Sequence, residues 1–174
     1  LRKVLGPHVQ QSGSLVEPDY LRFDFTHFKD IKDEELSKIQ DLINENILLN
    51  EKVSVEVMQK EQAQKGGAIA LFGEKYGEQV RVVSVGDFSK EFCGGTHLDN
   101  TGSIGIMLID SESSIGSGLR RIEALTGKLA YEKLKNNFVD MQNLSVLLKS
   151  KPEDVFKEVE LTINRNKKLE KEIM

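Results

Sequence analysis

The spacing of apolar residues changes to a purely helical pattern between residues 126 and 127, and this change constrains the fold most strongly. Before it, apolar and polar residues alternate in short segments such as residues 21–25 and 53–57, which indicates strands with one buried face. A helix opened by acidic residues interrupts them at residues 33–49. We therefore predict that residues 1–127 form an α+β domain, in which a mainly antiparallel sheet packs with helices.

Helical spacing of apolar residues runs through the rest of the chain, residues 128–174. A serine, a proline and an acid at residues 150–153 interrupt it in a pattern typical of a new helix start. This predicts a two-helix extension, either an αα-hairpin or the start of a coiled coil. Self-association through residues 128–174 is a candidate role for such an extension.

Composition decides the assignment of the remaining segments. Residues 12–14 fit either a turn or a bulged strand, and residues 104–109 suggest a strand. Serine and glycine dominate residues 111–118, which we predict to be a loop before a last strand at residues 119–125. Residues 68–72 are expected to form a short apolar segment, and residues 73–77 a loop.

One short motif, Cys93-Gly94-Gly95-Thr96-His97, holds the only cysteine and one of three histidines. A thiolate and an imidazole four positions apart suit zinc, and the two glycines are expected to take positive φ and let the backbone approach a ligand. Spacing alone leaves a second interpretation open, a small buried cysteine beside a turn histidine, because a zinc site needs three or four protein ligands. We expect His8 in a loop and His27 at a strand end.

Bulk composition fits a globular chain, with 39% hydrophobic and 30% charged residues. No apolar run approaches the length of a membrane span, so we expect no membrane association. A single cysteine excludes an internal disulfide and fits a reducing compartment, which predicts a cytoplasmic protein.

Four ordered motifs closely resemble the editing domain of alanyl-tRNA synthetase. The resemblance covers residues 1 to about 127, and the helical remainder fits the region after that domain in the family. The motifs that carry it are residues 9–16 with 21–25, residues 67–77, residues 86–105 and residues 118–127. It implies a domain that hydrolyses the ester in tRNA(Ala) mischarged with serine or glycine.

The resemblance also implies a zinc ion with four protein ligands. Two come from a Cys-x-x-x-His turn, here Cys93 and His97, and two from a His-x-x-x-His helix, which this sequence lacks. We expect that helix immediately before Leu1, both chain ends to be cut from a longer protein, and zinc binding to be incomplete in this fragment. ATP and Mg²⁺ would belong only to the missing synthetic domain of the parent protein.

Site residues are carried over from the matching motifs. Cys93, His97 and Gln11 are the expected catalytic group. For the segment Gln11-Ser12-Gly13-Ser14 an ordinary polar turn is the alternative. Of the two adjacent arginines, one is expected to contact the tRNA and the other to pair with Glu123. The expected substrate-binding residues are Ser12, Gly13, Ser14, Gly94, Gly95, Thr96, Arg120 and Arg121.

Charge limits the expected contact with tRNA. Residues 1–127 carry 14 Lys and Arg against 20 Asp and Glu, whereas a domain that holds nucleic acid by itself is usually basic. We therefore expect contact with little more than the acceptor end of tRNA(Ala). Two alternatives stay open: a free-standing trans-editing protein of the same superfamily, and a non-catalytic tRNA-binding or dimerisation module.

Overall fold

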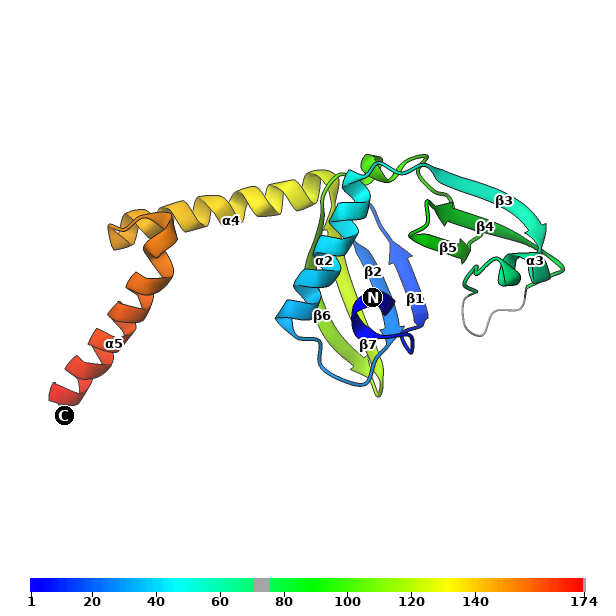
Figure 1. The fold of residues 1–174 in the computed structure, drawn as a ribbon. Helices are drawn as coiled ribbons and strands as arrows, with labels where there is room; N and C mark the ends of the chain where they lie inside the picture. Colours follow the sequence, from blue (N-terminus) through cyan, green and yellow to red (C-terminus); the bar gives the residue numbers. More distant parts are fainter. Residues whose placement is uncertain (71–75, 174) are drawn as a thin grey trace. The chain divides into compact units, whose positions relative to one another are not determined.

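The computed structural model describes residues 1–70 and 76–173 and divides into two compact units, residues 1–130 and residues 131–174 (Figure 1). In the first unit, the named strands form two separate antiparallel sheets, which confirms the α+β class but corrects the expectation of one sheet. The four-stranded sheet has the order β1 (Gln11–Val16), β2 (Leu21–Thr26), β7 (Leu119–Thr126), β6 (Met107–Gly116). The three-stranded sheet has the order β3 (Val53–Gln59), β4 (Gln79–Val85), β5 (Ser89–Phe92).

Helix α2 (Asp33–Leu48) packs on the four-stranded sheet and closes the main core. Its first turn is acidic, as expected, and the Glu35 carboxylate accepts a hydrogen bond from the Lys32 N–H at 2.9 Å. The short helix α1 (Arg2–Leu5) contacts α2 as well. The buried residues of this core are Val9, Phe25, Ile31, Ile47, Met107, Ile122 and Ala124.

Strand β6 corrects the predicted loop at residues 111–118. The strand continues to Gly116 and pairs with β7 along its length, with a register shift between Ile109 and Ser111. At this edge of the sheet, α2 supplies hydrogen bonds that a neighbouring strand would otherwise make. The Asn44 side chain bonds both the N–H and the C=O of Met107 at 2.8 Å, and Gln40 accepts from the Ile109 N–H at 2.8 Å.

Other uncertain segments are resolved by the structure. Residues 12–14 lie within β1, where the register shifts between Gln11 and Gly13, so the bulged strand is the correct alternative. The strand expected at residues 104–109 begins only at Met107, after a short 3-10 helix, η1 (Thr101–Ile104). The predictions for residues 68–72 and 73–77 fall partly outside the described residues.

The three-stranded sheet has a smaller core of its own. Helix α3 (Lys60–Lys65) packs on β3 and β4, and the rings of Tyr76 and Phe92 meet edge to face at 5.1 Å. The buried residues of this core are Ala63, Ala68, Val80, Val82 and Phe92. The end of β5, where the cysteine motif begins, is therefore anchored by a buried aromatic ring.

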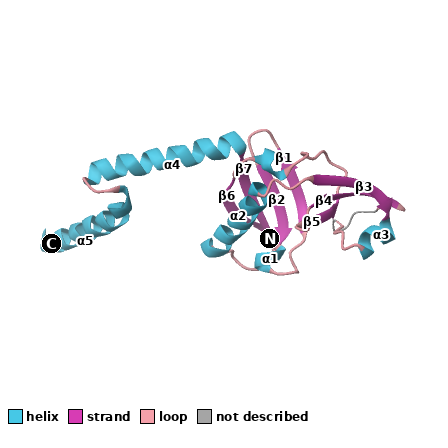
Figure 2. Cartoon of the chain, turned by 45° about the horizontal axis from the view of Figure 1, so that its top comes forward, coloured by secondary structure: helices cyan, strands magenta, loops and turns pink. Residues whose placement is uncertain are grey.

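The C-terminal residues form the expected two helices, α4 (Gly127–Leu148) and α5 (Val155–Ile173), joined through η2 (Pro152–Asp154) (Figure 2). Of the residues described in α5, only Val155 is buried. Large apolar side chains are exposed on both helices, including Phe138, Val146, Leu147 and Phe156. No helix among the described residues is long and apolar enough to cross a membrane.

Candidate functional site

Cys93 and His97 come together on the turn that follows β5. The Cys93 N–H donates to the Arg81 carbonyl at 3.1 Å, which extends the β4–β5 pairing by one residue. The chain then turns back, and His97 Nε2 lies 3.1 Å from Cys93 Sγ. Cys93 is half-buried and His97 is exposed, so both donor atoms lie at the surface of the first unit.

Gly94 and Gly95 shape this turn differently from the sequence-based expectation. Neither residue is among the glycines with positive φ in the described chain, whereas Gly86 in the β4–β5 connection takes a φ of 47°. A Cβ added to Gly94 would meet no atom within 4 Å, and one added to Gly95 would lie 3.6 Å from Cys93 Sγ. The space over Gly94 is therefore open, and the exposed Thr96 follows it.

Arg81 is a residue of this site that sequence reasoning missed. Its Nη1 donates to the Cys93 carbonyl at 2.6 Å and to the Gly95 carbonyl at 2.7 Å. The available signal was one arginine among the valines of β4, in the segment Val80-Arg81-Val82-Val83. A charged residue there needs polar partners, and the turn supplies them.

The Cys93–His97 pair fits one edge of a zinc site. Bonds of about 2.3 Å to sulfur and about 2.1 Å to nitrogen place two tetrahedral donors roughly 3.6 Å apart, which is close to the 3.1 Å seen here. No group of three or more metal-ligating residues occurs among the described residues. A zinc ion held by this pair would therefore need further donors from beyond the described residues.

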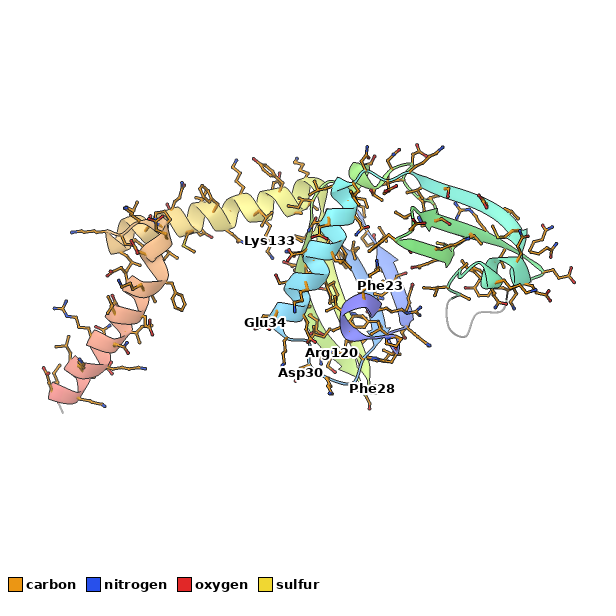
Figure 3. The ribbon with its side chains drawn as sticks, in the orientation of Figure 1. Phe23, Phe28, Asp30, Glu34, Arg120 and Lys133 are labelled. Atoms are coloured by element: carbon orange, nitrogen blue, oxygen red, sulfur yellow. The ribbon has the colours of Figure 1, made fainter. Side chains whose placement is uncertain are left out.

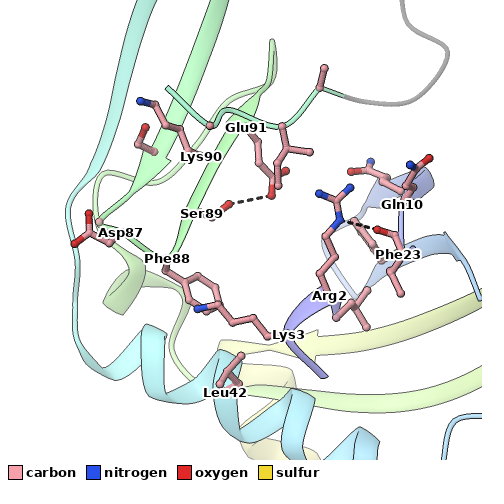
Figure 4. Close-up of a pocket in the computed structure, with 18 of the residues that line it drawn as sticks. Arg2, Lys3, Gln10, Phe23, Leu42, Asp87, Phe88, Ser89, Lys90 and Glu91 are labelled. Atoms are coloured by element: carbon pink, nitrogen blue, oxygen red, sulfur yellow. Dashed lines mark hydrogen bonds between the residues drawn. The ribbon is translucent and has the colours of Figure 1, made fainter. Parts of the chain in front are cut away.

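Gln11 lies in a second place, on a cavity of about 680 Å³ between β1 and β5 (Figure 4). Its side-chain amide donates to Ser14 Oγ at 3.0 Å, while Ser12 and Ser14 are exposed. Cys93 and His97 are not among the lining residues. The cavity has a mixed charge, because its polar lining includes Arg2, Lys3, Gln10, Lys90 and Glu91.

Two contacts organise the cavity wall. The Lys3 ammonium lies 4.3 Å from the centre of the Phe88 ring, a cation–π contact between α1 and the β4–β5 connection. Ser89 Oγ donates to Glu91 Oε1 at 2.9 Å on β5, two residues before Cys93. The cavity and the cysteine turn therefore share β5 as their common wall.

The two adjacent arginines point to opposite faces of β7, as neighbours on a strand do. Arg120 is buried and donates to both carboxylate oxygens of Glu112 and, at 2.6 Å, to Asp30 (Figure 3). Arg121 holds Asp24 with bonds of 2.7 and 2.9 Å. The expected partner Glu123 instead accepts from Ser111 Oγ at 3.3 Å. Both guanidinium groups are thus engaged within the chain.

His8 and His27 pair with each other. Their facing ring nitrogens are 2.9 Å apart, and the rings stack with centroids 5.2 Å apart. Burial, followed by the charge of His8, lowers the pKa of His27. His27 directly follows β2, which ends at Thr26, and His8 lies in the loop after α1, as the sequence indicates.

Comparison with known proteins matches the central region of the site. Residues 80–123 match the family described as "Threonyl and Alanyl tRNA synthetase second additional domain". The chain is 51% identical over 174 residues, 99% of its length, to the alanine–tRNA ligase of Saccharophagus degradans. It is 49% identical over 173 residues to those of Shewanella loihica and Clostridioides difficile. The resemblance to alanyl-tRNA synthetase is confirmed. The chain spans about a fifth of the length of these relatives.

The matched range contains part of the site that the alanyl-tRNA synthetase resemblance predicts. It begins next to Arg81, includes the turn at residues 93–97, and ends after Arg120 and Arg121. Gln11 lies outside it, on β1. The family match therefore includes most of β4, all of β5 and β6 and most of β7, whereas Asp24, the partner of Arg121, lies outside it on β2.

The ion pair between Arg121 and Asp24 predicts an acid-dependent stability. Hydrogen bonds from Arg121 hold the pKa of Asp24 below its ordinary 3.8, against the opposing effect of burial. The folded state therefore binds the proton less tightly than the unfolded state. This contribution to stability is complete above pH 3.8 and is lost as the pH falls through the lower folded-state pKa.

We expect Asp24→Asn to lower stability at about pH 6, and we expect this disadvantage to shrink as the pH falls below 3.8. Urea unfolding followed by circular dichroism across this range measures the difference. Asp19→Asn, at an exposed acid in the β1–β2 connection, is the control. A constant difference between Asp24→Asn and the unmodified chain at every pH would contradict the assignment.

Proposed function

We propose that this chain carries the editing centre of an alanine–tRNA ligase, which hydrolyses the ester that joins serine or glycine to tRNA(Ala). One observation carries the proposal: Cys93 Sγ and His97 Nε2 meet at 3.1 Å on an exposed turn, within the range that matches the synthetase family. A thiolate and an imidazole so placed are suited to hold one metal ion against a substrate.

A ligase for alanine has a physical need for such a centre. A synthetic pocket that accepts alanine cannot exclude the smaller glycine by size, and a small apolar pocket rejects the added hydroxyl of serine poorly. Hydrolysis at a second site removes the wrong product after it forms. The relatives compared above are alanine–tRNA ligases, which favours this proposal over a free-standing trans-editing protein.

The residues of the chain would have separate roles in binding the metal and the substrate. Cys93 and His97 would hold zinc together with donors beyond the described residues, so the chain alone is expected to bind zinc weakly, as elemental analysis after dialysis would measure. Zinc in such a site polarises a carbonyl or a bound water. Gln11 lines the neighbouring cavity and would orient the substrate through its amide. The open space over Gly94 would admit the terminal ester.

Because of its negative net charge, this chain would contact little more of the tRNA than the acceptor end. Acidic residues outnumber basic ones over the whole chain, which has a net charge of −4. Arg120 and Arg121 already hold carboxylates, so their positive charge is largely compensated within the chain. Other parts of a ligase would therefore supply most of the phosphate contacts.

Single-turnover deacylation by a full-length alanine–tRNA ligase containing this segment tests the proposal. We expect Ser-tRNA(Ala) and Gly-tRNA(Ala) to lose their amino acids much faster than Ala-tRNA(Ala), because only the mischarged forms are substrates of the second site. Equal rates for the three tRNAs, or rates no faster than without protein, would refute an editing centre.

Self-association through residues 128–174 is a second candidate, favoured by exposed apolar side chains on both helices. Phe138 is 62% exposed, and Leu147 and Phe156 are 78% and 83% exposed. Burying these groups between two copies would be favourable. Sedimentation velocity of the chain, with and without Phe138→Glu and Phe156→Glu, would distinguish a dimer held by these helices from a monomer.

A further inference from the structure

Arg81 holds the cysteine turn from two sides. Its main-chain carbonyl accepts the Cys93 N–H at 3.1 Å, and its side-chain Nη1 donates to the Cys93 and Gly95 carbonyls at 2.6 and 2.7 Å. Arg81 also pairs with Val57 on β3, so Val57, Arg81 and Cys93 form one row across the sheet. The guanidinium therefore lies next to the cysteine whose backbone it binds.

The turn depends on this contact because the sheet ends just before it. The last recorded pair of β4 and β5 joins Val82 to Phe92, and the following residues pass beyond the strands. Two consecutive glycines make this segment costly to order, since glycine loses more conformational freedom than other residues. The Cys93 and Gly95 carbonyls both accept hydrogen bonds from Arg81 Nη1, so the chain bends at Gly94 between them. This bend brings His97 close to Cys93.

We propose that Arg81 is a positioning residue, which holds residues 93–97 in the shape that brings Cys93 Sγ and His97 Nε2 together. The proposal deepens the editing function and rests on it for its catalytic consequence. Arg81 acts through the backbone of the turn, as outer partners of metal ligands commonly do. A merely structural role would instead show as a general weakening of the β4–β5 pairing.

Comparison of Arg81→Met with the unmodified 174-residue chain tests positioning without any metal or substrate. The expected result is loss of the nuclear Overhauser contact between the Cys93 β-protons and the His97 ring protons. Exchange of the Cys93 amide should become about tenfold faster, since two hydrogen bonds of the turn are lost. Amides inside β4 and β5 should keep their exchange rates. An unchanged Cys93–His97 contact in Arg81→Met would overturn the proposal.

Two further variants sharpen this test. Gln79→Met is the matched control, because Gln79 lies two residues earlier on the same face of β4 and is exposed. It should preserve the contact between Cys93 and His97. Arg81→Lys should restore part of it, because an ammonium group carries three donors and can serve both carbonyls. Equal loss of the contact in Arg81→Lys and Gln79→Met would mean that any change in β4 disturbs the turn, and would overturn a specific role.

The same variants in a full-length alanine–tRNA ligase test the consequence for function. We expect Arg81→Met to lower both Co²⁺ affinity, read from thiolate-to-metal absorption, and deacylation of Ser-tRNA(Ala) by about 10–100-fold. Unchanged Co²⁺ affinity despite a loosened turn would overturn the link to the metal. If the unmodified ligase neither binds Co²⁺ through Cys93 nor deacylates Ser-tRNA(Ala), the editing function fails, and the contact measured in the isolated chain still decides the role of Arg81.

Discussion

Replacing Cys93 by alanine in a full-length alanine–tRNA ligase is expected to lower single-turnover deacylation of Ser-tRNA(Ala) by about 100-fold or more. Loss of a metal ligand should exceed the 10–100-fold that loss of an outer partner costs. Cys93 is the only cysteine of the chain, so no second thiol of the chain can replace it. Circular dichroism and aminoacylation with alanine check that the variant still folds.

Companion variants separate a metal-centred site from an ordinary polar one. His97→Ala should act like Cys93→Ala, and the double variant should be little worse than either, because two ligands of one ion act as a unit. Gln11→Ala should be milder, since it removes one amide from the cavity wall and leaves the Cys93–His97 pair intact. Full deacylation by a folded Cys93→Ala protein would refute the role of this pair.

Removing the Phe25 ring is expected to destabilise the first unit by about 3–5 kcal/mol, the usual range for truncating a buried phenylalanine. Phe25 is fully buried (0% exposed) in the core beneath α2. Phe28, three residues later, is 81% exposed, so Phe28→Ala should change stability by no more than about 0.5 kcal/mol. The two substitutions remove the same atoms and differ in burial.

Guanidinium-induced unfolding of the 174-residue chain, followed by circular dichroism, measures both effects. Phe25→Leu provides a milder variant, expected to cost roughly 1–2 kcal/mol, in case Phe25→Ala is already unfolded without denaturant. Similar losses for Phe25→Ala and Phe28→Ala would contradict the described core. So would a Phe25→Leu protein as stable as the unmodified chain.

Local patterns in the sequence were sufficient for most of the fold. Residues 21–25 alternate and residues 33–49 have helical spacing because their apolar side chains face the core. This order of apolar and polar residues can be seen within a short stretch of sequence. The same holds for the change to helices at residue 127. The cysteine motif also lies within five consecutive residues, so the meeting of Cys93 and His97 follows from one turn.

Contacts between residues that are far apart in the sequence could be seen only in the tertiary structure. The composition of the serine-rich segment after Ile109 favours a loop, but the segment is a strand because β7 pairs with it. At the start of β6, Asn44 and Gln40 of α2 form hydrogen bonds with the backbone of this edge strand. Arg121 binds Asp24, 97 residues away, in preference to nearby Glu123.

The cysteine turn combines both kinds of information. Its donor atoms and their spacing are properties of the sequence, and together with the family resemblance they predict zinc chemistry. The shape of the turn could not be predicted from the sequence. The expected positive φ of Gly94 and Gly95 is absent, and Arg81 on the neighbouring strand binds the turn instead. A hydrogen bond between strands depends on sheet register, which local spacing does not encode. The sequence therefore determined which atoms could do the chemistry, and the tertiary structure decided what holds them in place.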